Sequence, residues 1–133
     1  MRIHLLLAVA LLAPLGAEAD CGGADRCCAE PGALYVCRRV SVSAISVPSA
    51  TYVRPFAGYQ AGDATITIAA GGGLGAPSAC TLESGNSFRL SRNDTNFELL
   101  LSVLQAAKLT NQVIDLSAVD AAGSCRIDIV KGF

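Results

Sequence analysis

Apolar and polar residues alternate along most of this chain, which is the period of half-buried β-strands. The first such run has its apolar members at every second position: Val40, Val42 and Ala44. The alternation then slips by one residue at Ile45 and Val47, which predicts a bulge or a bend. Pro48 cannot donate a hydrogen bond to a ladder and is expected to end this strand. Extended structure is predicted to resume at residues 51–54.

The alternation continues in the later part of the chain. After a turn at residues 62–63, one face of the next strand is predicted to hold Ala64, Ile66, Ile68 and Ala70. A turn at residues 84–86 predicts a hairpin whose second strand runs through Phe88 and Leu90. Another turn at residues 111–112 precedes two closing strands, which are predicted to face inward through Ile114, Leu116, Ala118, Cys125, Ile127 and Ile129. Five or six short strands are therefore expected.

The glycine-rich segment GGGLG at residues 71–75 has two interpretations. A phosphate-binding loop is followed by Lys-Ser/Thr and by the start of a helix. Neither feature follows this segment, so a flexible hairpin loop is the predicted structure.

One segment, NFELLLSVLQAAK, follows the period of a helix instead. Thr95 and Glu98 have the S/T-x-x-E spacing of a capping box, and a helix is predicted over about residues 95–109. Its apolar side is made of Phe97, Leu100, Leu101, Val103, Leu104 and Ala107. Leu99 and Ala106 widen this apolar side, which indicates either a deep core or a second packing partner such as another subunit.

The N-terminal residues have the pattern of an export signal. Arg2 and His4 precede an apolar run at residues 5–15, and Ala17-Glu18-Ala19 fits the small-x-small cleavage rule. A membrane anchor is the alternative, but this run is too short to cross a bilayer. We therefore expect a signal peptide over residues 1–19, cleavage after Ala19, no membrane insertion, and a secreted or periplasmic protein.

Cleavage would leave 114 of the 133 residues, which suffices for one domain. It would also remove His4, the only histidine, so no Ser-His-Asp triad or His-ligated metal site is expected. Asp115 and Asp128 lie on alternating strands and are expected to face solvent, so the chain is not expected to be an enzyme. No cofactor and no metal are expected. Losing Arg2 and Glu18 leaves nine basic and ten acidic residues, and no basic run is longer than Arg38-Arg39. Nucleic-acid binding is therefore not expected.

The six cysteines all follow the predicted cleavage site: Cys21, Cys27, Cys28, Cys37, Cys80 and Cys125. An even number in an exported chain favours disulfides, and the spacing lacks the paired C-x₂-C knuckles of zinc sites. About fifteen full pairings are open. We predict a Cys80–Cys125 bridge, with the other four paired among themselves and with different partners for the neighbours Cys27 and Cys28. Residues 20–37 are predicted to form an irregular cysteine-rich segment ahead of a domain over residues 38–133.

The expected order is a series of five or six short strands with one helix inserted before the last two strands. This order predicts a mainly β fold with one helix (β+α). Its architecture is expected to be a partly open Greek-key barrel that resembles an oligonucleotide/oligosaccharide-binding (OB) fold. From Cys80 to the C-terminus, the helix pattern NFELLLSVLQAAK, the turn before VIDL and the bracketing cysteines resemble B subunits of pentameric bacterial AB toxins. Within that group they are closest to the subtilase-cytotoxin-B-like set of small secreted proteins. The resemblance implies an OB fold, glycan recognition on host cells and a homopentamer, whose pore the helix would face. The chain has no Trp, and none of the family's sugar-contacting residues is matched one for one.

Two functions are therefore predicted as alternatives. The first is a non-catalytic carbohydrate-binding or toxin-delivery subunit with a glycan partner, because sugars are bound by an aromatic face together with planar polar groups. The candidate ligand-binding residues are Tyr52, Arg54, Tyr59 and Gln60, although tyrosines of this kind are also ordinary core or surface residues. The second is a secreted or periplasmic protein-interaction or inhibitor protein, which binds a protein partner through a strand edge or the glycine-rich loop.

Overall fold

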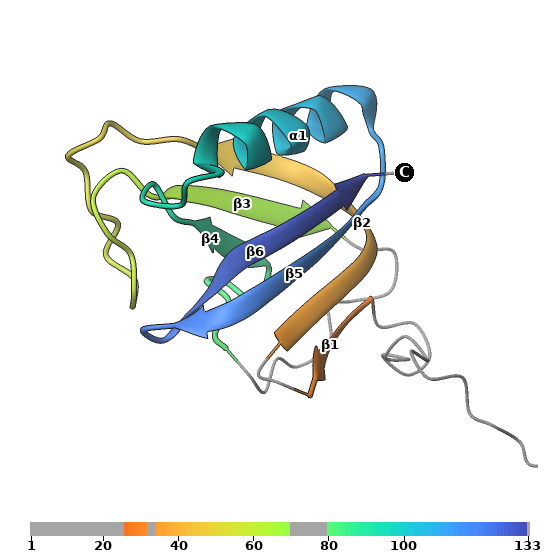
Figure 1. Cartoon of the computed structure of the whole chain (residues 1–133), viewed down its shortest axis with the longest axis horizontal. Helices are drawn as coiled ribbons and strands as arrows, with labels where there is room; N and C mark the ends of the chain where they lie inside the picture. The colour runs from red at the N-terminus through yellow and green to blue at the C-terminus, as the bar shows by residue number, and fades with distance from the viewer. Residues whose placement is uncertain (1–25, 32–33, 70–79, 133) are drawn as a thin grey trace, which may run out of the picture.

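The computed structural model describes residues 26–31, 34–69 and 80–132 (Figure 1). The predicted signal peptide, Cys21 and the glycine-rich segment lie outside these residues. Within them the chain is mainly β with one helix, as predicted, and its elements are β1 (Cys27–Glu30), β2 (Leu34–Ser46), β3 (Ala64–Ala69), β4 (Ser87–Leu90), α1 (Phe97–Thr110), β5 (Ile114–Ala121) and β6 (Ser124–Gly132).

The strands form one sheet that closes into a partly open barrel. Their order is β1-β2-β3-β4-β6-β5, and β2 also pairs with β5, so that five of the six strands complete the ring. The antiparallel pairs β2–β3 and β2–β5 share the long strand β2, whereas β4 and β6 are parallel and meet only at Arg89 and Arg126. With α1 inserted between β4 and β5, this arrangement is OB-like, which confirms the predicted fold class.

Bulges bend β2, whose first part pairs with β5 and whose last part pairs with β3. The predicted slip is confirmed as a register shift between Val42 and Ala44 in the ladder with β3. A second shift, between Cys37 and Val40, interrupts the ladder with β5 where Arg39 has a φ of 52°. Because bulges bend and twist a strand, one 13-residue strand can serve two sides of the barrel.

The structure corrects the predicted extended segment and the predicted irregular segment. Residues 51–54 form no strand, and residues 47–63 instead connect β2 and β3 by turns and bends. The segment predicted to be irregular contains β1 and the start of β2, paired in an antiparallel hairpin. Its short, small-residue sequence does not show this pairing, which the bridge between the register partners Cys27 and Cys37 crosslinks.

Helix α1 lies across one end of the barrel (Figure 1). Its buried side chains are Phe97, Leu101, Leu104 and Ala107, which confirms the predicted apolar side. The predicted capping box was wrong: the N-cap is Asn96, and no side chain caps the helix. Asp94 organises the first turn instead, because its carboxylate accepts a hydrogen bond from the backbone N–H of Asn96 (2.8 Å). The predicted turn after the helix is confirmed at Asn111, which is left-handed with a φ of 51°.

The apolar residues that widen the helix face are not part of the core. Leu99 is 64% exposed and Ala106 is exposed as well, so the deep-core interpretation of these two residues was wrong. Leu109, in the last turn, is 83% exposed.

The closing strand departs from strict alternation. Cys125 and Ile127 are buried as predicted, but Ile129 is 59% exposed. A register shift between Ser117 and Ala118 in the β5–β6 ladder inserts one extra residue in β6, which turns Ile129 outward and brings Val130 against the core.

Disulfides crosslink the fold. The predicted bridge between Cys80 and Cys125 is present, with the two Cα atoms 5.0 Å apart. Cys27 is bonded to Cys37, and its neighbour Cys28 is also disulfide-bonded, as the prediction of different partners requires. Disulfides indicate an oxidising environment, such as the extracellular space or the periplasm. None of the helices in the described residues is long and apolar enough to cross a membrane.

Candidate functional site

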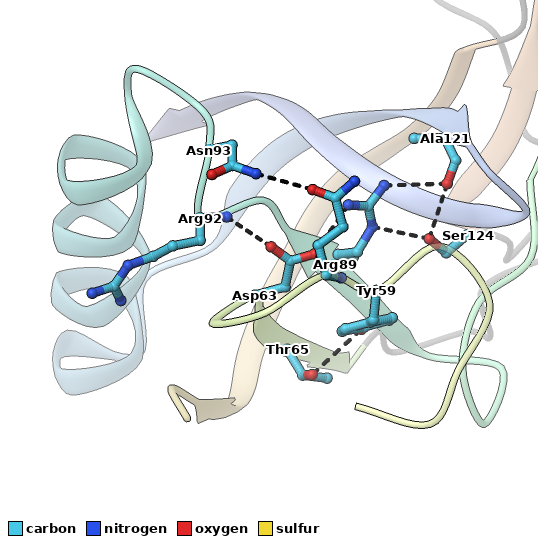
Figure 2. A network of polar contacts seen from close by, with 9 residues as sticks. Tyr59, Asp63, Thr65, Arg89, Arg92, Asn93, Ala121 and Ser124 are labelled. Atoms are coloured by element: carbon cyan, nitrogen blue, oxygen red, sulfur yellow. Dashed lines mark hydrogen bonds and ion pairs between the residues drawn. The ribbon is translucent and has the colours of Figure 1, made fainter. Parts of the chain in front are cut away.

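Three segments far apart in the sequence meet at one end of the barrel. They are the connection at residues 47–63, the end of β4 with the residues that follow it, and the hairpin between β5 and β6 (Figure 2). Between them lies a cleft of about 350 Å³. Its lining is mostly polar and includes Gln60, Arg89, Ser91, Asn93, Asp94 and Arg126.

A buried ion pair holds the first two segments together (Figure 2). Arg89 Nη1 donates to Asp63 Oδ2 at 3.1 Å, and the two side chains are 5% and 0% exposed. The same carboxylate accepts hydrogen bonds from the backbone N–H groups of Gln60 (2.8 Å) and Arg92 (2.9 Å). The bonds from Arg89 and Arg92 anchor the connection to the end of β4, and the bond from Gln60 closes a turn within the connection, so that the buried carboxylate has its hydrogen-bonding partners.

The remaining donors of Arg89 hold the hairpin. Its Nε donates to Ser124 Oγ at 3.0 Å, and its Nη2 donates to the backbone oxygen of Ala121 at 3.1 Å. The guanidinium of Arg89 is thus hydrogen-bonded through all three of its nitrogens and acts as the structural centre of the cleft.

The connection also touches the hairpin directly. Gly58 has a φ of +81°, and a Cβ placed on it would lie 2.5 Å from the backbone oxygen of Ala121 and 2.6 Å from Ser124 Oγ. Only glycine fits such a close approach in this conformation. In the hairpin itself, Ala122 and Gly123 both have positive φ values of 56° and 94°, as a two-residue type I′ turn requires.

The four candidate ligand residues predicted from the sequence come from one connection but have different surroundings. Gln60 lines the cleft, and its Oε1 accepts a hydrogen bond from Asn93 Nδ2 at 2.9 Å. Tyr59 is buried, and Tyr52 is 48% exposed. Arg54 lies against Glu83, with its Nε 2.6 Å from Oε2. Of the four, Gln60 is the one that lines the cleft.

Two of these side chains have shifted pKa values. Burial raises the pKa of the Tyr59 phenol above its ordinary value, and the hydrogen bond that its oxygen accepts from Thr65 Oγ1 (3.3 Å) partly opposes this. The hydrogen bond to Glu83 raises the pKa of Arg54. Tyr59 therefore stays neutral, and Arg54 stays charged, through the physiological pH range.

The central pair of the cleft, Asp63 and Arg89, was missed by the sequence analysis. The two residues are 26 positions apart in the sequence. The alternation of apolar and polar residues showed only that Arg89 stands between two residues predicted to face inward, Phe88 and Leu90. In the structure all four residues of β4 are buried. An arginine inside a short apolar strand, and an aspartate just after a turn glycine, were the only signals that could have drawn attention to them.

The fold and the cleft define this protein as a small OB-like β-barrel whose polar cleft is built from connecting segments. The cleft offers amide, hydroxyl and guanidinium groups, which bind polar ligands through hydrogen bonds. No group of three or more His, Cys, Asp or Glu side chains that could hold a metal ion occurs in the described residues. In comparisons with known proteins, no family model, no curated protein and no solved structure matches this chain.

Proposed function

We propose that this protein is an exported, non-catalytic binding module whose cleft holds a glycan. The observation that carries the proposal is the position of the polar cleft. It lies between the connection that follows the first barrel strand and the hairpin that joins the last two. In OB folds these same connections bind oligonucleotides and oligosaccharides. Export with cleavage after Ala19, and delivery of a toxin as the resemblance implies, belong to the same proposal.

The chemistry of the cleft suits a sugar better than a nucleic acid. Gln60 and Asn93 share one hydrogen bond, and within the described residues the amide nitrogen of Gln60 and the amide oxygen of Asn93 remain for ligand hydroxyls. Planar amides at fixed spacing are suited to the paired hydroxyls of a sugar ring. The nearly balanced charge of the chain, −1 overall, supplies no field for a phosphate backbone.

A glycan array probed with the purified protein tests this function. We expect retention of a small group of related glycans, and about a tenfold weaker retention for the Gln60→Ala/Asn93→Ala double variant, because each lost hydrogen bond is worth roughly 0.5–1.5 kcal/mol. Gln105→Ala is the matched control, because it removes an exposed amide from α1, away from the cleft. An array on which no glycan is retained at high protein concentration would remove the proposal.

Exposed apolar residues on α1 favour a second candidate, one chain of a self-assembling protein. Leu99 and Leu109 are largely exposed, and Leu109 lines a groove of about 440 Å³ together with Ile45 and Val47. Exposed apolar surface of this kind marks contact sites between proteins. The contact that we propose here is with a second copy of this chain, in line with the homopentamer that the resemblance implies.

The solution mass tests this second candidate. We expect an assembly of about five chains by sedimentation analysis, and dissociation of that assembly in the Leu109→Glu variant, which places a charge in the proposed contact. Glu98→Gln, an exposed substitution in the first turn of the same helix, serves as the control. A wild-type protein that is monomeric at every concentration would rule out self-assembly.

A further inference from the structure

The outer face of the sheet formed by β1, β2, β5 and β6 carries a row of small and apolar side chains (Figure 1). The strand register gives the order of this apolar row as Cys28, Val36, Ser117 and Ile129. Val36 and Ser117 are half-buried, and Ile129 is 59% exposed. The register shift that turns Ile129 outward therefore extends the apolar row into solvent.

A row of charged residues runs beside the apolar row. Side chains alternate between the two faces of a strand, so the exposed Arg26, next to the buried Cys27, belongs to the outer face. The backbone oxygen of Arg26 accepts a hydrogen bond from the N–H of Arg38 (2.8 Å), and Asp115 lies opposite Lys131 in the β5–β6 ladder. A small pocket of about 180 Å³ joins the two rows, and its lining includes Val36, Arg38, Asp115, Ser117, Ile129 and Lys131.

Two cations of the charged row have no acidic partner among the described residues. Arg38 forms an ion pair with Glu30 (3.3 Å), and the carboxylate of Asp115 accepts a hydrogen bond from a backbone N–H of β2 (2.8 Å). No ion pair in the described part of the chain involves Arg26 or Lys131. These two cations stand at opposite ends of the charged row, three strand spacings or about 14 Å apart.

The charge of the outer face complements an acidic partner. Arg39 is a further exposed basic residue beside the charged row, and Asp128 is a further exposed acidic one. Basic residues outnumber acidic residues on this face even when Glu30 is included, whereas the whole chain has a formal net charge of −1. Arginine and exposed apolar side chains together are typical of surfaces that bind other proteins.

We infer that the outer face binds an acidic, extended segment of a partner protein. An extended segment that lies between the two rows directs alternate side chains to opposite sides. Its apolar side chains contact Val36 and Ile129, and its carboxylates bind the two cations, Arg26 and Lys131. An extended chain advances about 3.3 Å per residue, so carboxylates four residues apart span about 13 Å, which is close to the separation of these cations.

Two observations separate this surface from the glycan cleft and from a polysaccharide site. The pocket on the outer face shares no lining residue with the cleft, so the inference goes beyond the proposed function. A sulfated polysaccharide would match the positive charges, but it would leave the apolar row in water. A protein segment supplies both kinds of contact.

A capped peptide of the sequence EVSVE tests the inference, because it carries two carboxylates four residues apart and two valines between them. We expect millimolar EVSVE to shift the backbone NMR signals of Val36, Ser117 and Ile129 saturably. The peptides QVSVQ and ESSSE lack the charges and the apolar side chains, respectively. Each should bind about tenfold more weakly than EVSVE.

Matched variants assign the binding to this face. Arg26→Met/Lys131→Met should weaken the binding of EVSVE about tenfold and leave that of QVSVQ unchanged, because only the charged contacts are removed. Ile129→Ser should weaken the binding of both peptides. Lys108→Met removes an exposed cation from α1 and is the control. Thermal melts of every variant separate a loss of binding from a loss of folding, and retention on the glycan array should be unaltered throughout.

Three outcomes would overturn the inference while the proposed glycan function stands. They are equal binding of EVSVE and QVSVQ, full binding of EVSVE by Arg26→Met/Lys131→Met, and no shift at Val36, Ser117 and Ile129. Heparin is the competing class of ligand. If heparin bound more tightly than EVSVE, and its binding depended on Arg26 and Lys131 but not on Ile129, the outer face would be a polysaccharide site instead.

Discussion

Replacing Asp63 with asparagine is expected to lower the free energy of unfolding by about 3–5 kcal/mol, the usual cost of breaking a buried ion pair. The substitution keeps the shape of the side chain but leaves the guanidinium of Arg89 charged and buried without its anion. One of the three hydrogen bonds to the carboxylate would also lose strength or be lost. Urea unfolding followed by circular dichroism measures the change.

The matched control for this variant is Glu83→Gln. Glu83 forms an ion pair with Arg54 that is partly exposed to solvent, with the Arg54 side chain 34% exposed. Because solvent and salt screen such a pair, its loss is expected to cost no more than about 1 kcal/mol. If Asp63→Asn cost no more than Glu83→Gln, the buried pair would not be the centre that holds the cleft together. If it does cost more, the destabilised cleft should also bind its ligand more weakly.

Removal of the bridge between Cys80 and Cys125 is the second large expected effect. The bridge joins residues 45 positions apart, and the loop that it closes contains β4, α1 and β5. On the chain-entropy model such a loop is worth about 4 kcal/mol, because the crosslink restricts the unfolded chain. The Cys80→Ser/Cys125→Ser variant should therefore melt roughly 15 °C or more below the wild-type protein in differential scanning calorimetry.

The shorter bridge offers an internal comparison. Cys27 and Cys37 are 10 positions apart, so the same model gives this bridge about 2.5–3 kcal/mol. The Cys27→Ser/Cys37→Ser variant should consequently lose less stability than the variant that lacks the longer bridge. Equal melting temperatures for the wild-type protein and for the Cys80→Ser/Cys125→Ser variant would show that the longer bridge does not stabilise the fold.

The amino-acid sequence predicted much of the framework through local patterns. Alternation of apolar residues predicted β3, β5 and the bulged part of β2, and the helical period predicted α1, because each pattern reflects which face of an element meets the core. The bridge between Cys80 and Cys125 followed from the separation of the cysteines into two groups. An OB-like barrel followed from the order of these elements.

The errors occurred where strand register or the path of the chain overrode a local pattern. Alternation alone placed Ile129 inside, but a register shift against β5 turned it outward. Thr95 and Glu98 have the spacing of a capping box, yet the chain enters the helix one residue later and Asp94 supplies the hydrogen bond. A local pattern cannot report the register of a partner strand or the direction from which the chain enters a helix.

The sequence by itself determined the helix, most of the barrel strands, their order and the disulfide chemistry that crosslinks them, because periodicity and cysteine content are local properties. Only the tertiary structure decided where the cleft lies and what it contains. Asp63 lies in the connection before β3, Arg89 in β4 and Arg126 in β6. The antiparallel pairing of β3 with β4 brings Asp63 to Arg89, and the parallel pairing of β4 with β6 brings Arg126 beside Arg89. Their roles depend on burial, because a charge removed from water must find a partner in the protein or in a ligand. That requirement separates Arg89, which has its partners, from Arg126, whose buried Nε has none in the described residues.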